Sequence, residues 1–246
     1  MKTIEVKWRY GKIDLFCEDK LISNSILHYG EWAQKEIEFI SELLELEKGS
    51  NIIFGGANVG IQSIAIANMI DESNTIYSFE IHPQIFELLD RNVANSNCLN
   101  IRATNQGLSN SKETIFVPRI ESLNLDNIGA FSISNVDLKG ELAAELISID
   151  ELKLDDCSFI HLDIEGHEIS CIKGAINTIK SFHPDIYAEI TTSRRGQSLY
   201  NKLVSYYTNV YIHCPKAFNK GNYKGCLLYT SPSPRDRTRS RMPSSA

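Results

Sequence analysis

Four side chains that could bind a metal or move a proton lie within seven residues of one another: His161, Asp163, Glu165 and His167. Carboxylates and imidazoles ligate divalent ions, and either group can take a proton from a hydroxyl. A structural role is also open, with His161 in the core and Glu165 favourable at a helix N-terminus. We rank proton transfer or positioning by Asp163, Glu165 and His167 first and a metal last. His167 is the preferred base because imidazole titrates near neutrality.

A second group of residues is typical of nucleoside binding. A glycine-rich turn, Gly55 to Gly60, stands between a short apolar segment and a helical pattern. Glycine allows a tight turn and close approach of a ligand, and the following helix offers free amides. Glu80 follows the next apolar segment, where a carboxylate can accept both hydroxyls of a ribose. Such a turn also occurs for packing alone, so the two features count only together.

The elements that must position these residues alternate along the chain. Short strands are expected at 51–54, 75–79, 101–104, 159–163, 186–189 and 210–213, and helices at 31–46, 61–70, from 83, 166–181 and 197–207. This rhythm predicts an α/β fold: a Rossmann-like, mostly parallel sheet with helices on both faces. Ligands bind at the carboxyl ends of such strands. A small hairpin is expected over 3–16, and a strand-rich insertion over 113–149.

Composition limits the class of protein. The 246 residues are 42% hydrophobic and 23% charged, with a net charge of −6, which is typical of a folded domain and argues against a nucleic-acid partner. The six cysteines form no C-x-x-C pair and indicate reduced thiols. We find no signal peptide and no membrane-spanning run, and expect a cytoplasmic protein without a membrane partner. The oligomeric state is left open.

The last residues, 226–246, differ sharply in composition from the rest. They hold three of the seven prolines and four arginines but no lysine. They are typical of a disordered tail or of read-through from a cloning or sequencing adapter, and we prefer the second interpretation. The predicted division is therefore an N-terminal extension (1–30), a Rossmann-like domain (31–225) and a non-native or disordered tail (226–246).

Longer motifs resemble one family. The -G-A-N-x-G- turn resembles the first motif of class I S-adenosylmethionine-dependent methyltransferases. The string Ile160 to Glu168, followed by Lys173-Gly174-Ala175, resembles the D-x-E-G…K-G-A signature of the FkbM-type methyltransferases. The likeness extends from about Gly30 to about His213 and includes Phe79 to Pro83, Asn105 to Ser109 and His183 to Glu189.

The resemblance implies a class I methyltransferase fold, S-adenosylmethionine as cofactor and transfer of a methyl group to a hydroxyl of a small metabolite or glycan. It implies that Gly56 to Gly60 hold the methionine end, Glu80 the ribose, and Asp163 the region of the sulfonium and acceptor. The expected cofactor-binding residues are Gly56, Ala57, Asn58, Gly60, Glu80, Ile81, Asn105, Gln106, Gly107 and Asp163.

Two positions depart from the family pattern. Phe54 stands where the family has an aspartate that helps hold the ammonium group of the cofactor, and His161 stands where it has a lysine. A methyltransferase-like binding domain without turnover is therefore one alternative. A nicotinamide-dependent oxidoreductase is another, although Ala57 replaces the middle glycine of its G-x-G-x-x-G turn.

Overall fold

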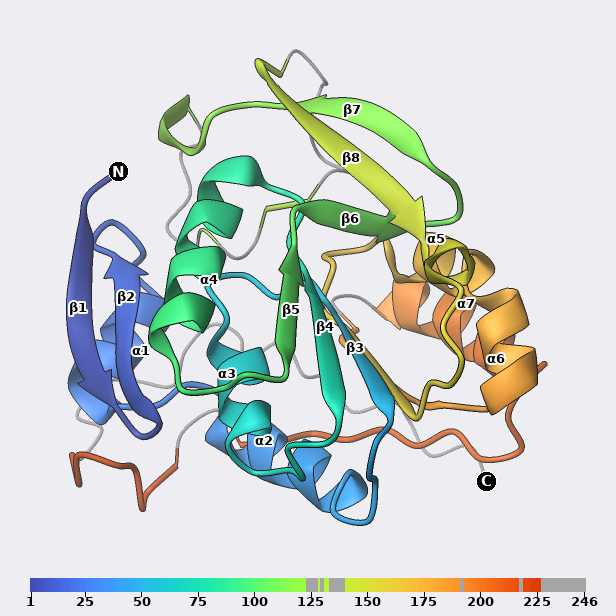
Figure 1. The fold of residues 1–246 in the computed structure, drawn as a ribbon, viewed down its shortest axis with the longest axis horizontal. Helices are drawn as coiled ribbons and strands as arrows, with labels where there is room; N and C mark the ends of the chain where they lie inside the picture. The colour runs from blue at the N-terminus through green and yellow to red at the C-terminus, as the bar shows by residue number, and fades with distance from the viewer. Residues whose placement is uncertain (123–127, 129–130, 133–139, 191–192, 217–218, 227–246) are drawn as a thin grey trace.

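A parallel five-stranded sheet forms the centre of the molecule (Figure 1). The computed structural model describes residues 1–122, 128, 131–132, 140–190, 193–216 and 219–226. The strand order is β10-β9-β3-β4-β5, and every neighbouring pair is parallel. The strands are β3 (Asn51–Gly55), β4 (Thr75–Phe79), β5 (Ile101–Thr104), β9 (Phe159–Leu162) and β10 (Asp185–Ala188). The predicted fold class is confirmed.

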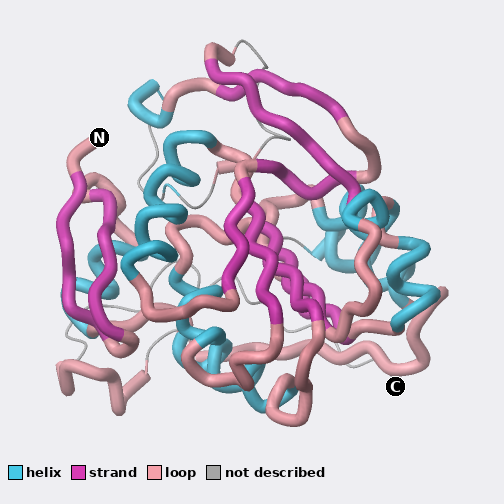
Figure 2. Tube along the Cα trace, in the orientation of Figure 1, coloured by secondary structure: helices cyan, strands magenta, loops and turns pink. Residues whose placement is uncertain are grey.

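Alternate residues of each strand face opposite layers of helices, as the period of two requires. Ile52 and Phe54 belong to the hydrophobic core on one face, with α2 (Gln34–Leu43), α3 (Ile61–Ala67) and α4 (Pro83–Asn95). Ile53 belongs to the core on the other face, with α5 (Glu168–Lys173), α6 (Ile176–Phe182) and α7 (Ser193–Leu203). Figure 2 shows the strands enclosed between these helices. Both faces are covered, so the functional groups gather at the strand ends.

A second, mixed sheet extends this end of the molecule. Its order is β6-β8-β7, with β6 (Gln106–Ser109), β7 (Glu113–Val117) and β8 (Leu142–Ser148). Only Asn105 separates β5 from β6, so the second sheet begins where the central sheet ends (Figure 1). Two short 3-10 helices, η1 (Ile120–Ser122) and η4 (Ile149–Leu152), flank it. The expected strand-rich insertion is confirmed within its described residues.

The N-terminal residues form the expected antiparallel hairpin, β1 (Thr3–Trp8) and β2 (Gly11–Phe16). Asn92 of α4 fastens it, since its side chain accepts from the Asp14 amide at 2.8 Å and donates to the Asp14 carbonyl at 2.9 Å. The same amide group donates to the Val59 carbonyl at 2.8 Å. One buried asparagine therefore connects the hairpin, α4 and the glycine turn.

Three elements differ from those expected. A helix not anticipated, α1 (Ile22–Tyr29), precedes α2. The helix expected over 166–181 is divided, because the Asp150 carboxylate accepts from the amides of Asn177 and Thr178 and so begins a new helix, α6. No strand forms over 210–213, where Tyr211 is 85% and Ile212 66% exposed. Val210 packs against the core, but the apolar residues that follow it, Tyr211 and Ile212, are not covered by the fold.

The described C-terminal segment, 219–226, returns to the beginning of the chain. Glu31 is buried, and its carboxylate accepts from the Arg9 guanidinium, the Asn219 side-chain amide and the Tyr223 backbone amide. Gly30 has φ +73°, and a Cβ there would lie 2.6 Å from the Tyr223 ring. The junction of α1 and α2 is thus enclosed by both ends of the described chain. The predicted boundaries at 30 and 226 stay predictions.

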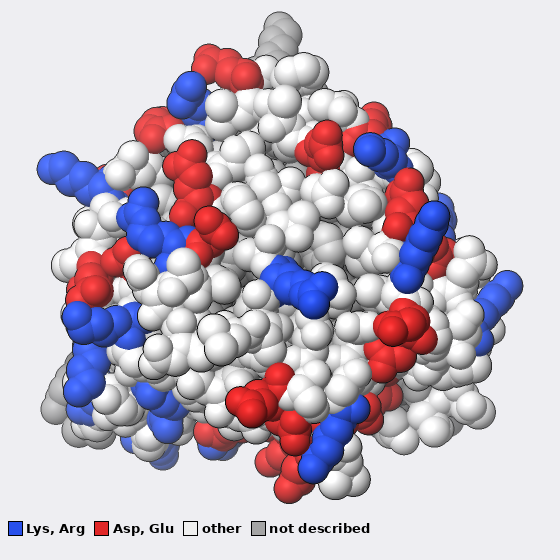
Figure 3. Space-filling model, viewed as in Figure 1, with Lys and Arg blue, Asp and Glu red and all other residues white. Residues whose placement is uncertain are grey.

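Charged side chains are scattered over the face shown in Figure 3, with Lys and Arg set among Asp and Glu. The described residues of that face form no continuous basic stripe of the kind that follows a nucleic-acid backbone. Among the described helices, none is both long and apolar enough to cross a bilayer.

Candidate active site

The glycine turn packs against the end of strand β9 and is hydrogen-bonded to the end of β4. Gly56 has φ +76°, and a Cβ there would lie 1.9 Å from the Asp163 carbonyl oxygen, so only glycine fits. The amides of Gly56 and Ala57 both donate to the Phe79 carbonyl, at 3.0 and 2.9 Å. The turn therefore joins the ends of β3, β4 and β9 at one point.

The amides of this turn all have acceptors within the protein. The Asn58 amide donates to the Glu80 carboxylate, that of Val59 to the Asn58 side chain, and that of Gly60 to the Ala57 carbonyl. The free amides expected from the sequence are those at the start of the following helix, α3, and they stay a prediction. The turn itself contributes room for close approach, while side chains contribute polar contacts.

Glu80 is the most buried acid beside this turn, with 6% of its surface exposed. Its Oε2 accepts from the Asn58 amide and its Oε1 from the His82 amide, each at 2.9 Å. Burial raises the pKa of this carboxyl from 4.5 to about 7, although these amides oppose the rise. The Asn105 side-chain amide fixes the backbone at this position by donating to the carbonyls of Glu80 and Ile81.

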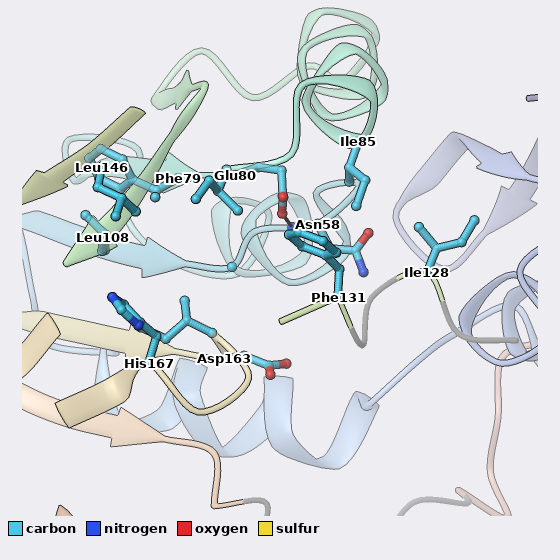
Figure 4. A pocket seen from close by; sticks show the side chains of 14 residues that line it. Asn58, Phe79, Glu80, Ile85, Leu108, Ile128, Phe131, Leu146, Asp163 and His167 are labelled. Carbon is cyan, nitrogen blue, oxygen red and sulfur yellow. Dashed lines mark hydrogen bonds between the residues drawn. The ribbon is translucent and has the colours of Figure 1, made fainter. Parts of the chain in front are cut away.

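Glu80 and Asp163 border one cavity, which contains about 560 Å³ of space not filled by atoms, part of it open to solvent (Figure 4). Its polar side chains are Asn58, Glu80, Asp163 and His167, and the rest of its wall is apolar. The apolar wall consists of Phe79, Ile81, Ile85, Leu108, Ile128, Phe131, Leu146 and Ile164, with the glycines Gly56 and Gly107.

The structure brings together most of the predicted site residues. Gly56, Asn58, Glu80, Ile81, Gly107, Asp163 and His167 line the cavity. Ala57, Gly60, Asn105, Gln106 and Glu165 are not among the lining residues. Sequence reasoning missed Ile128, Phe131 and Leu146, because an apolar residue in an insertion carries no signal that separates a cofactor wall from a core.

Three carboxylates meet at the ends of β9 and β10. Oxygens of Asp163, Glu165 and Glu189 lie within 4.8 Å of one another. Burial raises the pKa of Asp163 well above its ordinary value, and the hydrogen bond and charge of Glu189 and the charges of Glu165 and Glu36 raise it further. Oxygens so spaced suit a hard divalent cation, but acidic groups often gather without one. The prediction that no metal is used stays a prediction.

His167 lies at the other side of the cavity. Its Nε2 and the Ser109 hydroxyl of β6 are 2.9 Å apart, and burial lowers the pKa of the imidazole. In Figure 4 the ring points toward Leu108 and Leu146, while the Asp163 carboxylate points the opposite way. The side chains expected to act together thus face different regions of the site. The predicted role of His167 as a base stays a prediction.

The two departures from the expected motif are neighbours in the sheet. Phe54 of β3 pairs in register with His161 of β9, and their rings stack with centroids 4.9 Å apart. The His161 ring stacks in turn on Tyr187 of β10 at 5.6 Å. His161 is 2% exposed, and therefore belongs to the sheet and not to the open cavity. The two replacements form one aromatic contact.

The family model described as "Methyltransferase FkbM domain" matches residues 55–210, well over half of the chain. The chain belongs to the FkbM methyltransferase family. The match spans the glycine turn, Glu80, the three carboxylates and His167. No curated protein matches the chain.

One solved methyltransferase shares the fold of this FkbM domain, and others are more distantly similar to it. An FkbM methyltransferase from Methylobacillus flagellatus KT is 17% identical, with a TM-score of 0.53, over 76% of this chain and 44% of that structure. A precorrin-6y C5,15-methyltransferase from Geobacter metallireducens GS-15 is 14% identical (TM-score 0.45; 70% and 71% covered). An S-adenosylmethionine-dependent methyltransferase from Aquifex aeolicus is 12% identical (TM-score 0.44; 76% and 85%). The chain thus spans less than half of the Methylobacillus protein.

Proposed function

We propose that this chain uses S-adenosylmethionine to methylate a hydroxyl oxygen of a small metabolite or sugar. The observation that carries the proposal is the buried carboxylate of Glu80, which borders an apolar cavity whose far end is the carboxylate group of Asp163. A carboxylate that is costly to bury marks a polar partner in an otherwise apolar wall.

The residues present fit this cofactor. Glu80 would accept the ribose hydroxyls, and the apolar side chains of Ile81, Leu108 and Leu146 would contact the adenine ring. Gly56, where a Cβ would collide with the Asp163 carbonyl, would allow the chain joining nucleoside and amino acid to pass close to the backbone.

The cofactor, when bound, supplies an activated methyl group on a positively charged sulfonium. Asp163 would border that positive charge and the acceptor oxygen together. A carboxyl whose pKa lies above its ordinary value is, once ionised, a stronger base than usual, so Asp163 with Glu189 suits removal of the hydroxyl proton. We assign His167, paired with Ser109, to the nucleoside wall in preference to this step.

The charge of the site also limits the acceptor. Asp163, Glu165, Glu189 and Glu36 place several negative groups around the point of transfer. An anionic acceptor would be repelled there, whereas a neutral polyol or sugar could donate hydrogen bonds to the same oxygens.

The test combines calorimetry with a transfer assay. We expect S-adenosylhomocysteine to bind and NAD to leave the baseline unchanged, and labelled methyl groups to pass from S-adenosylmethionine to a member of a panel of sugars and polyols. Tight NAD binding without binding of S-adenosylhomocysteine would refute the proposal.

A binding domain without turnover is the second candidate, and Phe54 is the observation that favours it. Strand β3 carries no acid, and Phe54 is buried against His161. Binding of S-adenosylhomocysteine without transfer to any member of the panel would support this candidate over the enzyme.

A further inference from the structure

Glu36 is an acid outside all of the motifs, yet it contacts His161 of β9, the strand that ends just before Asp163. It lies in the first turn of α2 and its side chain is 19% exposed. Its Oε1 accepts from the Gln62 side-chain amide at 2.7 Å and lies 3.5 Å from Nε2 of His161. Gln62 belongs to α3, which directly follows the glycine turn, so Glu36 bridges α3 and β9.

The Glu36 carboxylate acts on the same region as the three carboxylates at the strand ends. Its charge is among the causes that raise the pKa of Asp163, so the two groups repel one another across a short space. Repulsion of this kind is relieved when a cation lies between the groups.

No lysine or arginine of the described residues supplies that cation. Among the described residues, no Lys or Arg lies within ion-pair distance of Glu36, and its Oε2 has no hydrogen-bond partner. Strand β3 offers no carboxylate of its own, since Phe54 fills the space beside His161. Glu36, on α2, is thus an acid near the glycine turn with a carboxylate oxygen available to a ligand.

We propose that Glu36 binds the ammonium group of the cofactor's methionine end, an inference that rests on the proposed function. The ammonium offers three donors, and the free Oε2 offers an acceptor with the opposite charge. Gln62 and His161 both contact Oε1 of Glu36, which fixes the orientation of its carboxylate. An ion pair between Glu36 and this ammonium group would fix the methionine end of the cofactor, and with it the sulfonium beside Asp163.

Two ligands that differ only in the amino-acid end test the proposal. S-adenosylhomocysteine carries the ammonium, whereas methylthioadenosine has the same nucleoside and thioether without it. By calorimetry, Glu36→Gln should weaken S-adenosylhomocysteine about 10- to 100-fold and change methylthioadenosine less than about twofold. Glu42→Gln, an exposed acid on the same helix, should leave both affinities at the wild-type value.

Methylthioadenosine also reports that the nucleoside site of each variant is folded. Equal weakening of both ligands by Glu36→Gln, or no weakening of S-adenosylhomocysteine, overturns the role of Glu36. If the wild-type protein binds neither ligand, the proposed function itself fails, and the inference fails with it. The two failures are therefore distinguishable in one set of titrations.

Discussion

Glu80 makes the stability of the free protein depend on pH in an unusual direction. Its pKa is raised from 4.5 to about 7 by burial. Between these values the folded state holds a proton at Glu80 that the unfolded chain has released. Stability therefore falls as the pH rises through this window, opposite to the behaviour of an ion-paired carboxylate.

The size of the effect follows from the two pKa values. A change from 4.5 to about 7 corresponds to about 3 kcal/mol of unfolding free energy, fully lost above pH 7. In a protein of this length that is about 6–12 °C in Tm. The glutamine side chain in Glu80→Gln is neutral at every pH and has nearly the shape of glutamate. The unfolding free energy of this variant should therefore not show the decline that ionisation of Glu80 causes.

The assay is thermal unfolding of the wild type and of Glu80→Gln between pH 4.5 and 8.5, with and without S-adenosylhomocysteine. The two curves of the free protein should diverge between pH 4.5 and about 7 and keep their separation above it, with the variant relatively more stable on the alkaline side. The ligand should stabilise the wild type more at pH 8 than at pH 6, because ribose hydroxyls donate to the ionised form. Parallel curves for wild type and variant would refute the reasoning, and Glu72→Gln should follow the wild type.

Three further substitutions test the remaining geometry. Gly56→Ala should cost about 1–2 kcal/mol for the left-handed backbone and more for the collision with the Asp163 carbonyl; calorimetry should show loss of S-adenosylhomocysteine binding, and unchanged binding would contradict the close approach. Asp163→Asn should lower the rate of methyl transfer about 100- to 10,000-fold at saturating cofactor, and a rate near the wild-type value would remove Asp163 from proton transfer. His167→Ala should weaken cofactor binding while saturated turnover is kept; a loss of turnover at unchanged affinity would instead make His167 the base.

Local patterns were sufficient to predict the central sheet. Each buried strand is a short apolar run bounded by polar or glycine residues, so Asn51–Gly55 and Thr75–Phe79 could be located by hydrophobicity alone. The residues after these strands then lie at one edge of the sheet by topology. For this reason Gly56 and Glu80 were predicted to lie together, and the family resemblance added Asp163; all three line one cavity.

The features that were not predicted from the sequence depend on contacts between residues distant in sequence. The division between α5 and α6 requires Asp150, which lies outside the helical pattern it interrupts. The stack of Phe54 on His161 depends on the register of two strands about a hundred residues apart. Glu36 gave no signal, because a glutamate on an amphipathic helix is usually solvated. These positions were set by tertiary packing and not by local preference.

The closure of the chain at Glu31 has a consequence for how this protein is made. Glu31, once buried, relies on Asn219 and Tyr223, which leave the ribosome last among the described residues. Until they emerge, the α1–α2 junction holds a carboxylate whose burial is only partly compensated, by Arg9. The central sheet can assemble earlier in synthesis, whereas the junction must wait until residues 219–223 have emerged. Nascent chains stalled before residue 219 should therefore remain sensitive to proteases near residues 28–34 after the sheet has become protected.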